Sequence, residues 1–336
     1  MTRREALALA ALRHEEAVPK SALCRRLEAA GLILQDPEWW TWCASPIETP
    51  DGRVHVFYSR WRGVFGDWLH SCEIAHAVAG RPEGPYRYVN TVLRGRGGGH
   101  WDSDTVHNPT IHRVGRQYVL LYIGNHLAGT DLRNVVTHPA SRQRIGIAIS
   151  DSIDGPFERP NGRPLLDVTP DPAAWDSYLV TNPALLAHPS GEFWLYYKAW
   201  DRRHDGFRKI GLAKSERVEG PYRKHPGNPV VDFSRERKQV EDPYVYRSAG
   251  KYYMLLADDN EGVLKKHAGL LLESEDGERW SNVTLGYDTS DAYFGGDTLR
   301  FERPQVLMRR GAPAYLFLAV GGSAGRKSCA AVLRVR

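Results

Sequence analysis

Short apolar strands recur along this chain, and each set begins after a polar residue followed by proline. Each such pair leads into an apolar strand, and an aromatic-rich strand follows about ten residues later. Successive prolines of these pairs lie 60 to 74 residues apart. A repeat of this length with several strands per unit indicates the blades of a β-propeller. The pairs are Ser45-Pro46, Asn108-Pro109, Asn182-Pro183, Asp242-Pro243 and Arg303-Pro304.

Within a unit, the strands predict an up-and-down meander. A Gly-Pro-aromatic turn follows the third strand in three units, at Gly84, Gly155 and Gly220, and such a turn interrupts strand pairing. Trp-Asp-Ser precedes two units, at 101–103 and 175–177. We therefore predict an all-β fold, a five-bladed β-propeller over residues 41–336, whose blades begin near residues 42, 105, 179, 240 and 300. One way to close the ring is to place residues 333–336 beside an N-terminal strand.

Residues 1–40 differ from the rest of the chain. They are rich in Ala, Leu, Glu and Arg and show no strand pattern. Capping signals predict one helix that begins at Thr2 and a second from Ser21 to Ala30, closed by Gly31. The leucines of this helical N-terminal extension offer more apolar surface than two short helices can bury alone. We therefore expect a homodimer that forms through these helices.

Charge and composition narrow the function classes. The 336 residues carry a formal net charge of +5 in dispersed positions, so no nucleic-acid groove is indicated. No apolar run approaches the roughly 20 residues of a membrane helix. The four cysteines lack C-x-x-C spacing, which favours buried free thiols over a zinc site or a disulfide framework. We expect a cytoplasmic protein without a metal, unless a leader has been trimmed from a secreted or periplasmic one.

The first strand of each blade lines the central channel, so the residues at its start converge on one funnel. The carboxylates of this ring come from the fourth and fifth blades, at Glu241, Asp242 and Glu302, beside Arg303. Buried charges cost several kcal/mol unless they pair or serve a function. One interpretation is a salt-bridge network that joins blades. We favour the other, a carboxylate site, because glycosidic cleavage requires two acids in unlike environments.

The order of the units, with Asn-Pro or Asp-Pro at the first strand and Gly-Pro-Tyr/Phe after the third, resembles the propeller glycoside hydrolases of family 43. The resemblance covers about residues 40–336. It implies an inverting mechanism with an Asp base, a Glu acid and a further Asp that tunes the acid. Ser45 stands in the place of the base, and Asn108 and Asn182 stand in the places of other aspartates, so Asp242 alone matches this pattern.

The segment from Lys20 to Trp42, followed by Ser45-Pro46, also looks like glycoside hydrolase family 117. Those enzymes remove a terminal anhydrogalactose from red-algal oligosaccharides, and their two-helix N-terminal segment is exchanged between the subunits of a dimer. This resemblance implies an Asp base and a His acid, for which His267 and His107 are the nearest positions.

We predict a glycoside hydrolase, exo-acting and inverting, that cleaves a small oligosaccharide and requires no cofactor. The base is Asp102 or Asp242, and the acid is Glu241 or Glu302, with His107 as a further candidate. A cation or a water in the channel, among Asp242, His107 and Asn108, is left open. The alternatives are a carbohydrate-binding propeller without catalysis and a glycoside phosphorylase. Substrate-binding candidates are Arg303, Asn108, Asn182, Trp61, Arg60, Trp101, Lys198 and His267.

Overall fold

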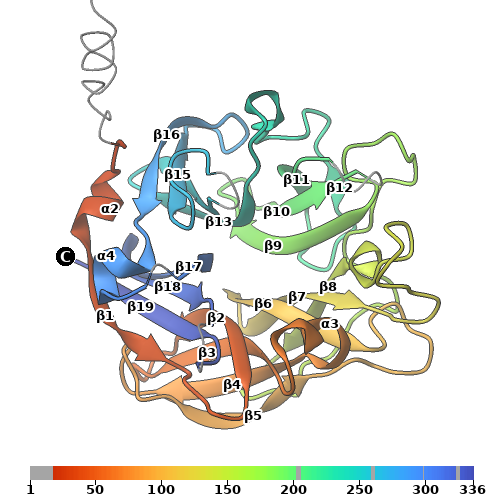
Figure 1. The fold of residues 1–336 in the computed structure, drawn as a ribbon, viewed down its shortest axis with the longest axis horizontal. Coiled ribbons are helices and arrows are strands. Elements are labelled where there is room, and N and C mark those ends of the chain that lie inside the picture. Colours follow the sequence, from red (N-terminus) through yellow and green to blue (C-terminus); the bar gives the residue numbers. More distant parts are fainter. Residues whose placement is uncertain (1–17, 202–205, 259–261, 298, 323–325) are drawn as a thin grey trace, which may run out of the picture.

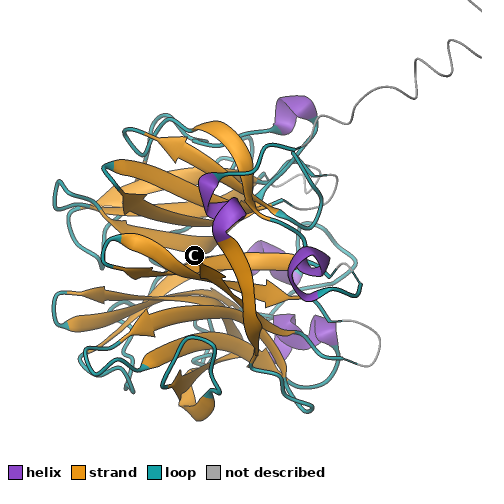
Figure 2. Ribbon diagram, turned by 90° about the vertical axis from the view of Figure 1, so that its left-hand side faces the viewer, coloured by secondary structure: helices purple, strands orange, loops and turns teal. Residues whose placement is uncertain are grey.

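Five antiparallel sheets surround a central channel (Figure 1). The computed structural model describes residues 18–201, 206–258, 262–297, 299–322 and 326–336. The first strand of each sheet lies nearest the axis, and the short helices gather toward one side of the stacked blades (Figure 2). The predicted five-bladed propeller is therefore confirmed. Its first strands begin at residues 40, 105, 179, 241 and 301, close to the predicted starts.

Each blade follows the expected meander. The first blade contains β2 (Trp40–Glu48), β3 (Val54–Trp61), β4 (Glu73–Ala79) and β5 (Arg87–Leu93), and the second contains β6 (Thr105–Val114), β7 (Gln117–Asn125) and β8 (Arg144–Ser150). The third contains β9 (Leu179–Ala187), β10 (Phe193–Trp200), β11 (Lys209–Ser215) and β12 (Arg223–Lys224). The fourth contains β13 (Glu241–Ser248), β14 (Lys251–Ala257), β15 (Gly269–Ser274) and β16 (Ser281–Tyr287). The fifth contains β17 (Phe301–Arg309), β18 (Ala312–Val320) and β19 (Cys329–Val335), with β1 (Leu27–Ile33) at its outer edge.

The helical elements are short and lie in the connections. They are α2 (Ala22–Arg26), η1 (Phe65–Asp67), α3 (Trp68–Ser71), η2 (Pro139–Arg142), η3 (Ser234–Glu236) and α4 (Ser290–Phe294). Among the residues that the structure describes, none of these helices is long and apolar enough to span a bilayer.

The hydrophobic core lies between blades. Side chains of a strand alternate between its two faces, so the middle strands of a blade face both neighbours. Trp194 and Leu212 of the third blade pack with Met254 and Leu270 of the fourth in one buried cluster. A blade therefore requires both neighbours to bury its two faces.

The N-terminal strand β1 closes the ring by pairing antiparallel with β19, from Leu27↔Val335 to Ile33↔Ala330. The predicted helix from Ser21 to Ala30 is thus wrong beyond Arg26. Ala, Leu and Glu are good helix formers, but helix propensity contributes little free energy per residue. The N–H and C=O groups at the edge of β19 require partners, and pairing with β1 outweighs that propensity. The other predicted helix, from Thr2, falls in residues 1–17, outside the described residues. Of the leucines expected to form the dimer surface, Leu23 and Leu27 are buried against the fourth and fifth blades of the same chain.

A bulge interrupts the first strand of all five blades at the same place. The residue at each bulge has a positive φ, a region that Asn and Asp tolerate best among residues with a side chain. Pro follows in four blades, where no ladder N–H is needed. We refer to these positions as the bulge ring: Cys43 (φ 58°), Asn108 (φ 50°), Asn182 (φ 51°), Asp242 (φ 58°) and Arg303 (φ 54°).

The bulge ring corrects the sequence alignment of the first blade. Its member there is Cys43, followed by Ala44, and not Ser45-Pro46. Ser45 lies two residues further along β2, where its hydroxyl donates to Gln305 (3.2 Å) and accepts from the backbone N–H of Ile111 (3.1 Å). Ser45 therefore joins blades one, two and five beneath the bulge ring. The place assigned to a catalytic base is occupied by a cysteine.

Candidate active site

A pocket of about 140 Å³ lies on the propeller axis, at the end of the channel where the first strands begin. Strands β2, β6, β9, β13 and β17 supply about half of its lining residues. The others come from β3 (Ser59 and Trp61), from the connection between β3 and β4 (Phe65, Trp68 and Cys72), from β10 (Lys198) and from the residue before β17 (Arg300). Nine of the predicted site residues line it: Trp61, His107, Asn108, Asn182, Lys198, Glu241, Asp242, Glu302 and Arg303. Six further residues line it: Trp42, Ser59, Phe65, Trp68, Cys72 and Arg300.

Side chains of the bulge ring form a continuous chain of hydrogen bonds around the axis. The Asn108 amide donates to the Asn182 carbonyl oxygen (3.1 Å), and the Asn182 amide donates to Asp242. Arg303 donates to Asp242 from its backbone N–H (3.0 Å) and from Nη1 (3.4 Å), and its Nε donates to the sulfur of Cys43 (3.2 Å). The Cys43 thiol in turn donates to a backbone carbonyl of the second blade (3.3 Å). The five blades are therefore tied together at their innermost points.

Asp242 is the centre of that network. Its side chain is 2% exposed, and both oxygens accept hydrogen bonds within the bulge ring. Burial raises the pKa of the Asp242 carboxyl, with Arg303 opposing that shift and Glu241 adding to it. These contacts fit a structural tie between blades better than a general base, although the carboxylate does line the pocket.

Glu241 and Glu302 each precede a bulge and occupy equivalent places in blades four and five. Both line the pocket and are 8% exposed. Glu241 forms ion pairs with Lys198 and with Arg208, whose Nη1 lies 2.8 Å from its Oε1. The Nε of Arg300 lies 2.7 Å from Oε1 of Glu302. Two carboxylates thus share one pocket, and each pairs with at least one cation.

His107 lies among cations and aromatic rings. Burial, with Arg303 and Lys198 adding to it, lowers the pKa of His107 to about 3, so the imidazole is neutral. Gln143 lies with its amide nitrogen 3.2 Å from Nε2, and donation from that amide places the imidazole proton on Nδ1. Because the charged form is so disfavoured, the structure does not support His107 as a general acid.

An aromatic wall closes one side of the pocket. Trp42 comes from β2, Trp61 ends β3, and Phe65 and Trp68 belong to η1 and α3. Phe65 lies edge-on to Trp42 (5.9 Å between centroids) and to Trp61 (5.8 Å), and Trp68 lies edge-on to His107 (5.0 Å). Apolar ring surfaces of this kind can pack on the carbon face of a sugar.

Asp102, predicted as an alternative base, does not line the pocket. Its side chain is fully buried, and its oxygens accept from Arg96 Nε (2.6 Å) and from the hydroxyl of Tyr122 (2.8 Å), with Arg159 Nε at 2.8 Å. Trp101, predicted to bind sugar, stacks on the ring of Tyr122 (5.9 Å). Neither side chain is brought to the candidate site.

The Trp-Asp pair is a repeated structural unit. In the third blade, Trp175 stacks on Tyr197 (5.8 Å), whose hydroxyl donates to Asp176 (3.2 Å), and Lys224 pairs with the same carboxylate (2.6 Å). In both blades the motif fastens the segment before the first strand to the middle strand. The repeat of Trp-Asp-Ser in the sequence reflects this packing and not catalysis.

Arg60 and His267 also lie outside the pocket lining. Arg60 pairs with Glu73 (2.8 Å) and packs over the rings of Trp39 (4.2 Å) and Tyr88 (4.3 Å). His267 lies between β14 and β15, where its backbone N–H donates to the carbonyl of Asp258 (3.0 Å) and its φ is 66°. Both positions are accounted for by local structure.

The residues that we considered for a channel cation lie beside a fixed positive charge. The guanidinium of Arg303 is 1% exposed and donates to Asp242, so a fixed positive charge already occupies this end of the channel. The same charge contributes to the low pKa of His107. A metal ion placed among Asp242, His107 and Asn108 would be repelled by that guanidinium.

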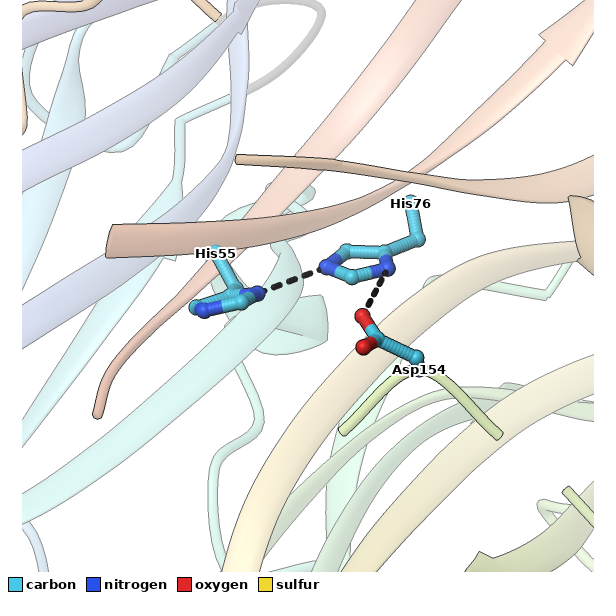
Figure 3. Close-up of side chains that lie close together, drawn as sticks. All are labelled: His55, His76 and Asp154. Carbon is cyan, nitrogen blue, oxygen red and sulfur yellow. Dashed lines mark hydrogen bonds and ion pairs between the residues drawn. The ribbon is translucent and has the colours of Figure 1, made fainter. Parts of the chain in front are cut away.

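A second cluster of titratable side chains lies between the first and second blades (Figure 3). Nδ1 of His55 lies 2.8 Å from Nε2 of His76, and Nδ1 of His76 lies 3.6 Å from a carboxylate oxygen of Asp154. Both rings are buried, and His76 stacks on Phe57 (4.7 Å). The three groups form a line with His76 in the middle. One nitrogen of each ring and one carboxylate oxygen lie within 4.8 Å of one another, the spacing of a candidate metal site, and of the two contacts only the one between His55 and His76 is a hydrogen bond.

Comparison with known proteins agrees with this geometry. The family model of the glycosyl hydrolases family 43 matches residues 84–278, more than half of the chain. A search of curated proteins finds no match.

Solved structures with the same fold include several glycoside hydrolases. A family 117 glycoside hydrolase produced by the marine bacterium Zobellia galactanivorans is 16% identical with a TM-score of 0.66, covering 92% of this chain and 88% of that one. An endo-arabinase from Bacteroides thetaiotaomicron is 13% identical with a TM-score of 0.61, covering 91% and 98%. A GH43_1 enzyme from Xanthomonas citri complexed with xylose is 19% identical with a TM-score of 0.59, covering 93% and 91%. At these identities the likeness shows the fold alone.

Proposed function

The chain belongs to glycosyl hydrolase family 43 and is a glycoside hydrolase, and we propose that it removes a terminal sugar from a small oligosaccharide by inversion, with Glu241 and Glu302 as its two catalytic carboxylates. The observation that carries this proposal is their placement. The two glutamates precede equivalent bulges in neighbouring blades and line one pocket. Cleavage of a glycosidic bond with inversion requires a carboxylate on each side of that bond.

Their partners suggest how the roles divide. Glu241 lies between two cations, Lys198 and Arg208, which favour its ionised form and suit a base that accepts a proton from water. Glu302 pairs with Arg300, whose side chain is 39% exposed, and we take it as the acid that protonates the leaving oxygen. In this mechanism water attacks the anomeric carbon while Glu302 donates its proton, and the configuration at that carbon inverts.

The pocket shape supports action on a chain end. Its volume of about 140 Å³ equals roughly five water molecules at about 30 Å³ each, which is the scale of one sugar ring. The hydrogen-bonded bulge ring crosses the channel beneath it. A sugar can therefore enter from one side only, with the rest of the substrate outside.

The proposed pair departs from the catalytic pattern that family 43 implies. That pattern places an Asp base at a first strand, and this chain has Cys43, Asn108 and Asn182 at the bulges of blades one to three. Burial raises the pKa of the Cys43 thiol, which makes it a poor base. The acidic groups that remain on the axis are in blades four and five, and we place the chemistry there.

The test is a screen of aryl glycosides and of algal, plant and microbial oligosaccharides, followed by variants on any substrate found. Glu302→Gln and Glu241→Gln should each lower turnover by about a hundredfold or more, as loss of a general acid or base does. The loss in Glu302→Gln should shrink on substrates whose leaving group needs no proton, such as dinitrophenyl glycosides. Proton NMR of the first product formed should show the inverted anomer.

The matched control is Glu83→Gln, which removes a glutamate that pairs with Arg334 (2.8 Å) away from the pocket. Wild-type turnover in both pocket variants would show that these carboxylates are not the catalysts. A protein that binds oligosaccharides and cleaves none would instead be the carbohydrate-binding propeller that the sequence left open.

A further inference from the structure

We infer that His55, His76 and Asp154 form a binding site for a divalent transition-metal ion such as Zn²⁺, and that the ion joins the first blade to the second. The starting observation is the spacing of the three side chains (Figure 3). One nitrogen of each imidazole and one carboxylate oxygen all lie within 4.8 Å of one another. Among the described residues, no other group of three or more His, Cys, Asp or Glu side chains has this spacing.

The strands that carry these residues place the site away from the sugar pocket. His55 lies on β3 and His76 on β4 of the first blade, and Asp154 follows β8 of the second blade. Trp61, which lines the pocket, is six residues after His55 in β3, so the two positions are about 20 Å apart along the strand. An ion at this site would hold two blades together and is independent of the proposed function.

The separations between the side chains suit ligands of one ion. Nδ1 of His76 lies 3.6 Å from the Asp154 oxygen, which is beyond hydrogen-bond range, and this buried nitrogen has no hydrogen-bond partner among the described residues. Bonds from Zn²⁺ to nitrogen and oxygen are about 2.0–2.2 Å long, so two ligand atoms of a tetrahedral ion lie roughly 3.3 Å apart. The contact between Nδ1 of His55 and Nε2 of His76, at 2.8 Å, would open by about 0.5 Å to admit an ion.

The flexibility needed to close the site lies in Asp154. Both histidines are buried, and the ring of His76 is held against Phe57 (4.7 Å between centroids). The backbone carbonyl of Asp154 accepts from the amide of Asn90 in the first blade (2.9 Å), whereas its side chain is 61% exposed. The two imidazoles are therefore held in place before an ion arrives. The carboxylate is free to rotate toward an ion that enters from solvent, and a water completes the four ligands.

The donor set selects the class of metal. Imidazole nitrogen suits Zn²⁺, Co²⁺, Ni²⁺ and Cu²⁺, whereas Ca²⁺ and Mg²⁺ prefer oxygen ligands. Burial lowers the pKa of both His55 and His76, which keeps the imidazoles in the neutral form that binds a metal. Arg53, the cation that acts on His55, already pairs with Asp51 (2.6 Å). The carboxylate of Asp154 has no Lys or Arg partner among the described residues, so its charge is available to a metal ion.

The first experiment measures metal binding to the full chain without a histidine tag. The protein is stripped with EDTA, the chelator is removed, and ZnCl₂ and CaCl₂ are titrated separately by calorimetry at pH 7.5. We expect a Zn²⁺ site of one ion per chain that Ca²⁺ does not fill. Because the ion binds the folded protein, Zn²⁺ at about a hundredfold above its Kd should raise the thermal unfolding midpoint by about 3 °C or more.

The second experiment assigns that ion to the three residues. Asp154→Asn, His55→Gln and His76→Gln should each weaken this Zn²⁺ site at least tenfold and remove the rise in the unfolding midpoint. The matched control is Asp151→Asn, which changes another exposed aspartate of the same turn, bonded to Gln117 (3.1 Å), and should leave Zn²⁺ binding unchanged. Since Asp154 is largely exposed, its variant tests the site even if the histidine variants do not fold. Visible absorption of the Co²⁺-loaded protein should likewise change in Asp154→Asn and not in Asp151→Asn.

The outcomes decide between a metal site and a simple contact between blades. Absence of a Zn²⁺ site in the wild-type protein overturns the inference, and so does Zn²⁺ binding that Asp154→Asn leaves unchanged, because the ion would then lie elsewhere on the chain. Ca²⁺ binding as tight as Zn²⁺ binding would refute the transition-metal class. Turnover per folded molecule on any substrate found should be the same with Zn²⁺ and with EDTA; a loss of turnover in EDTA that Asp154→Asn reproduces would refute a purely structural ion and leave the proposed carboxylates untouched.

Discussion

Replacing Asp242 with asparagine should destabilise the fold far more than it impairs the chemistry. Asp242 accepts from Asn182 through one oxygen and from the backbone of Arg303 through the other. The asparagine side chain has one acceptor oxygen, so its NH₂ group must face at least one of these donors. It also leaves the guanidinium of Arg303, which is 1% exposed, without a compensating charge.

The size of the effect follows from that burial. Removing one partner of a buried ion pair costs about 3–5 kcal/mol of unfolding free energy. With a urea slope of about 3 kcal/mol per molar, a loss of 4 kcal/mol lowers the unfolding midpoint by roughly 1.3 M. The control is Glu275→Gln, which breaks the exposed pair with Lys251 (2.8 Å) and should change the free energy by less than about 0.5 kcal/mol.

Activity measured where the protein is fully folded completes the test. Turnover per folded molecule of Asp242→Asn should stay within about tenfold of wild type, because the proposed acid and base are still present. Glu302→Gln should show the opposite pattern, with about a hundredfold loss and a stability change under 2 kcal/mol. A hundredfold loss of turnover in Asp242→Asn with unchanged stability would mean that Asp242 is a catalyst and that the bulge ring is not a structural tie.

Three further predictions follow from contacts described above. Burial lowers the pKa of His76 to about 4, so as pH falls the unfolded chain takes up this proton before the folded protein does. The stability that neutral His76 contributes is therefore complete above about pH 6.5 and falls by up to about 3 kcal/mol as pH drops toward 4. Urea unfolding of His76→Gln should show a smaller loss of stability in acid than wild type. Asp102→Asn should lower the free energy of unfolding by about 3 kcal/mol, because Arg96 and Arg159 lose their charged partner. It should leave turnover per folded molecule unchanged. A loss of turnover without a loss of stability would make Asp102 a candidate for the catalytic base again. Removal of residues 1–36 should cause aggregation, because it deletes β1 and exposes the edge of β19. A chain that begins at Val18 keeps β1 and should unfold at the wild-type midpoint. Light scattering of the chain that begins at Val18, beside the full chain, tests the expected dimer.

The repeat made the fold readable from the sequence, but not the alignment of its first blade. Proline after a polar residue marks the bulge in four blades, and the nearest such pair in blade one, Ser45-Pro46, lies two residues past the bulge. The bulge requires a left-handed residue and not a proline, and Cys43 gives no sequence signal for that conformation. Trp42 precedes the bulge of the first blade as Glu241 and Glu302 precede those of the fourth and fifth, so the correct alignment predicts Trp42 at the pocket.

The parts of the site that come from connections were beyond sequence reasoning. Phe65 and Trp68 reach the pocket because the β3–β4 connection folds over it, and Gln143 reaches His107 from the end of a long connection between β7 and β8. Such approaches depend on loop conformation, which no periodicity encodes. The helix expected over 21–30 failed for a related reason, since the partner that makes residues 27–33 a strand is some 300 residues away.

That separation has a consequence for how the protein is made. β1 leaves the ribosome before any of the blades, and its partner β19 follows about 300 residues later. At about 5–20 residues per second, roughly 300 residues take about 15 to 60 s to synthesise. During that interval β1 is an unpaired strand next to four growing blades, and the first and fifth blades have no common wall. The ring can therefore become complete only after β19 has been made, and aggregation of partly made chains is the hazard that this order of synthesis imposes.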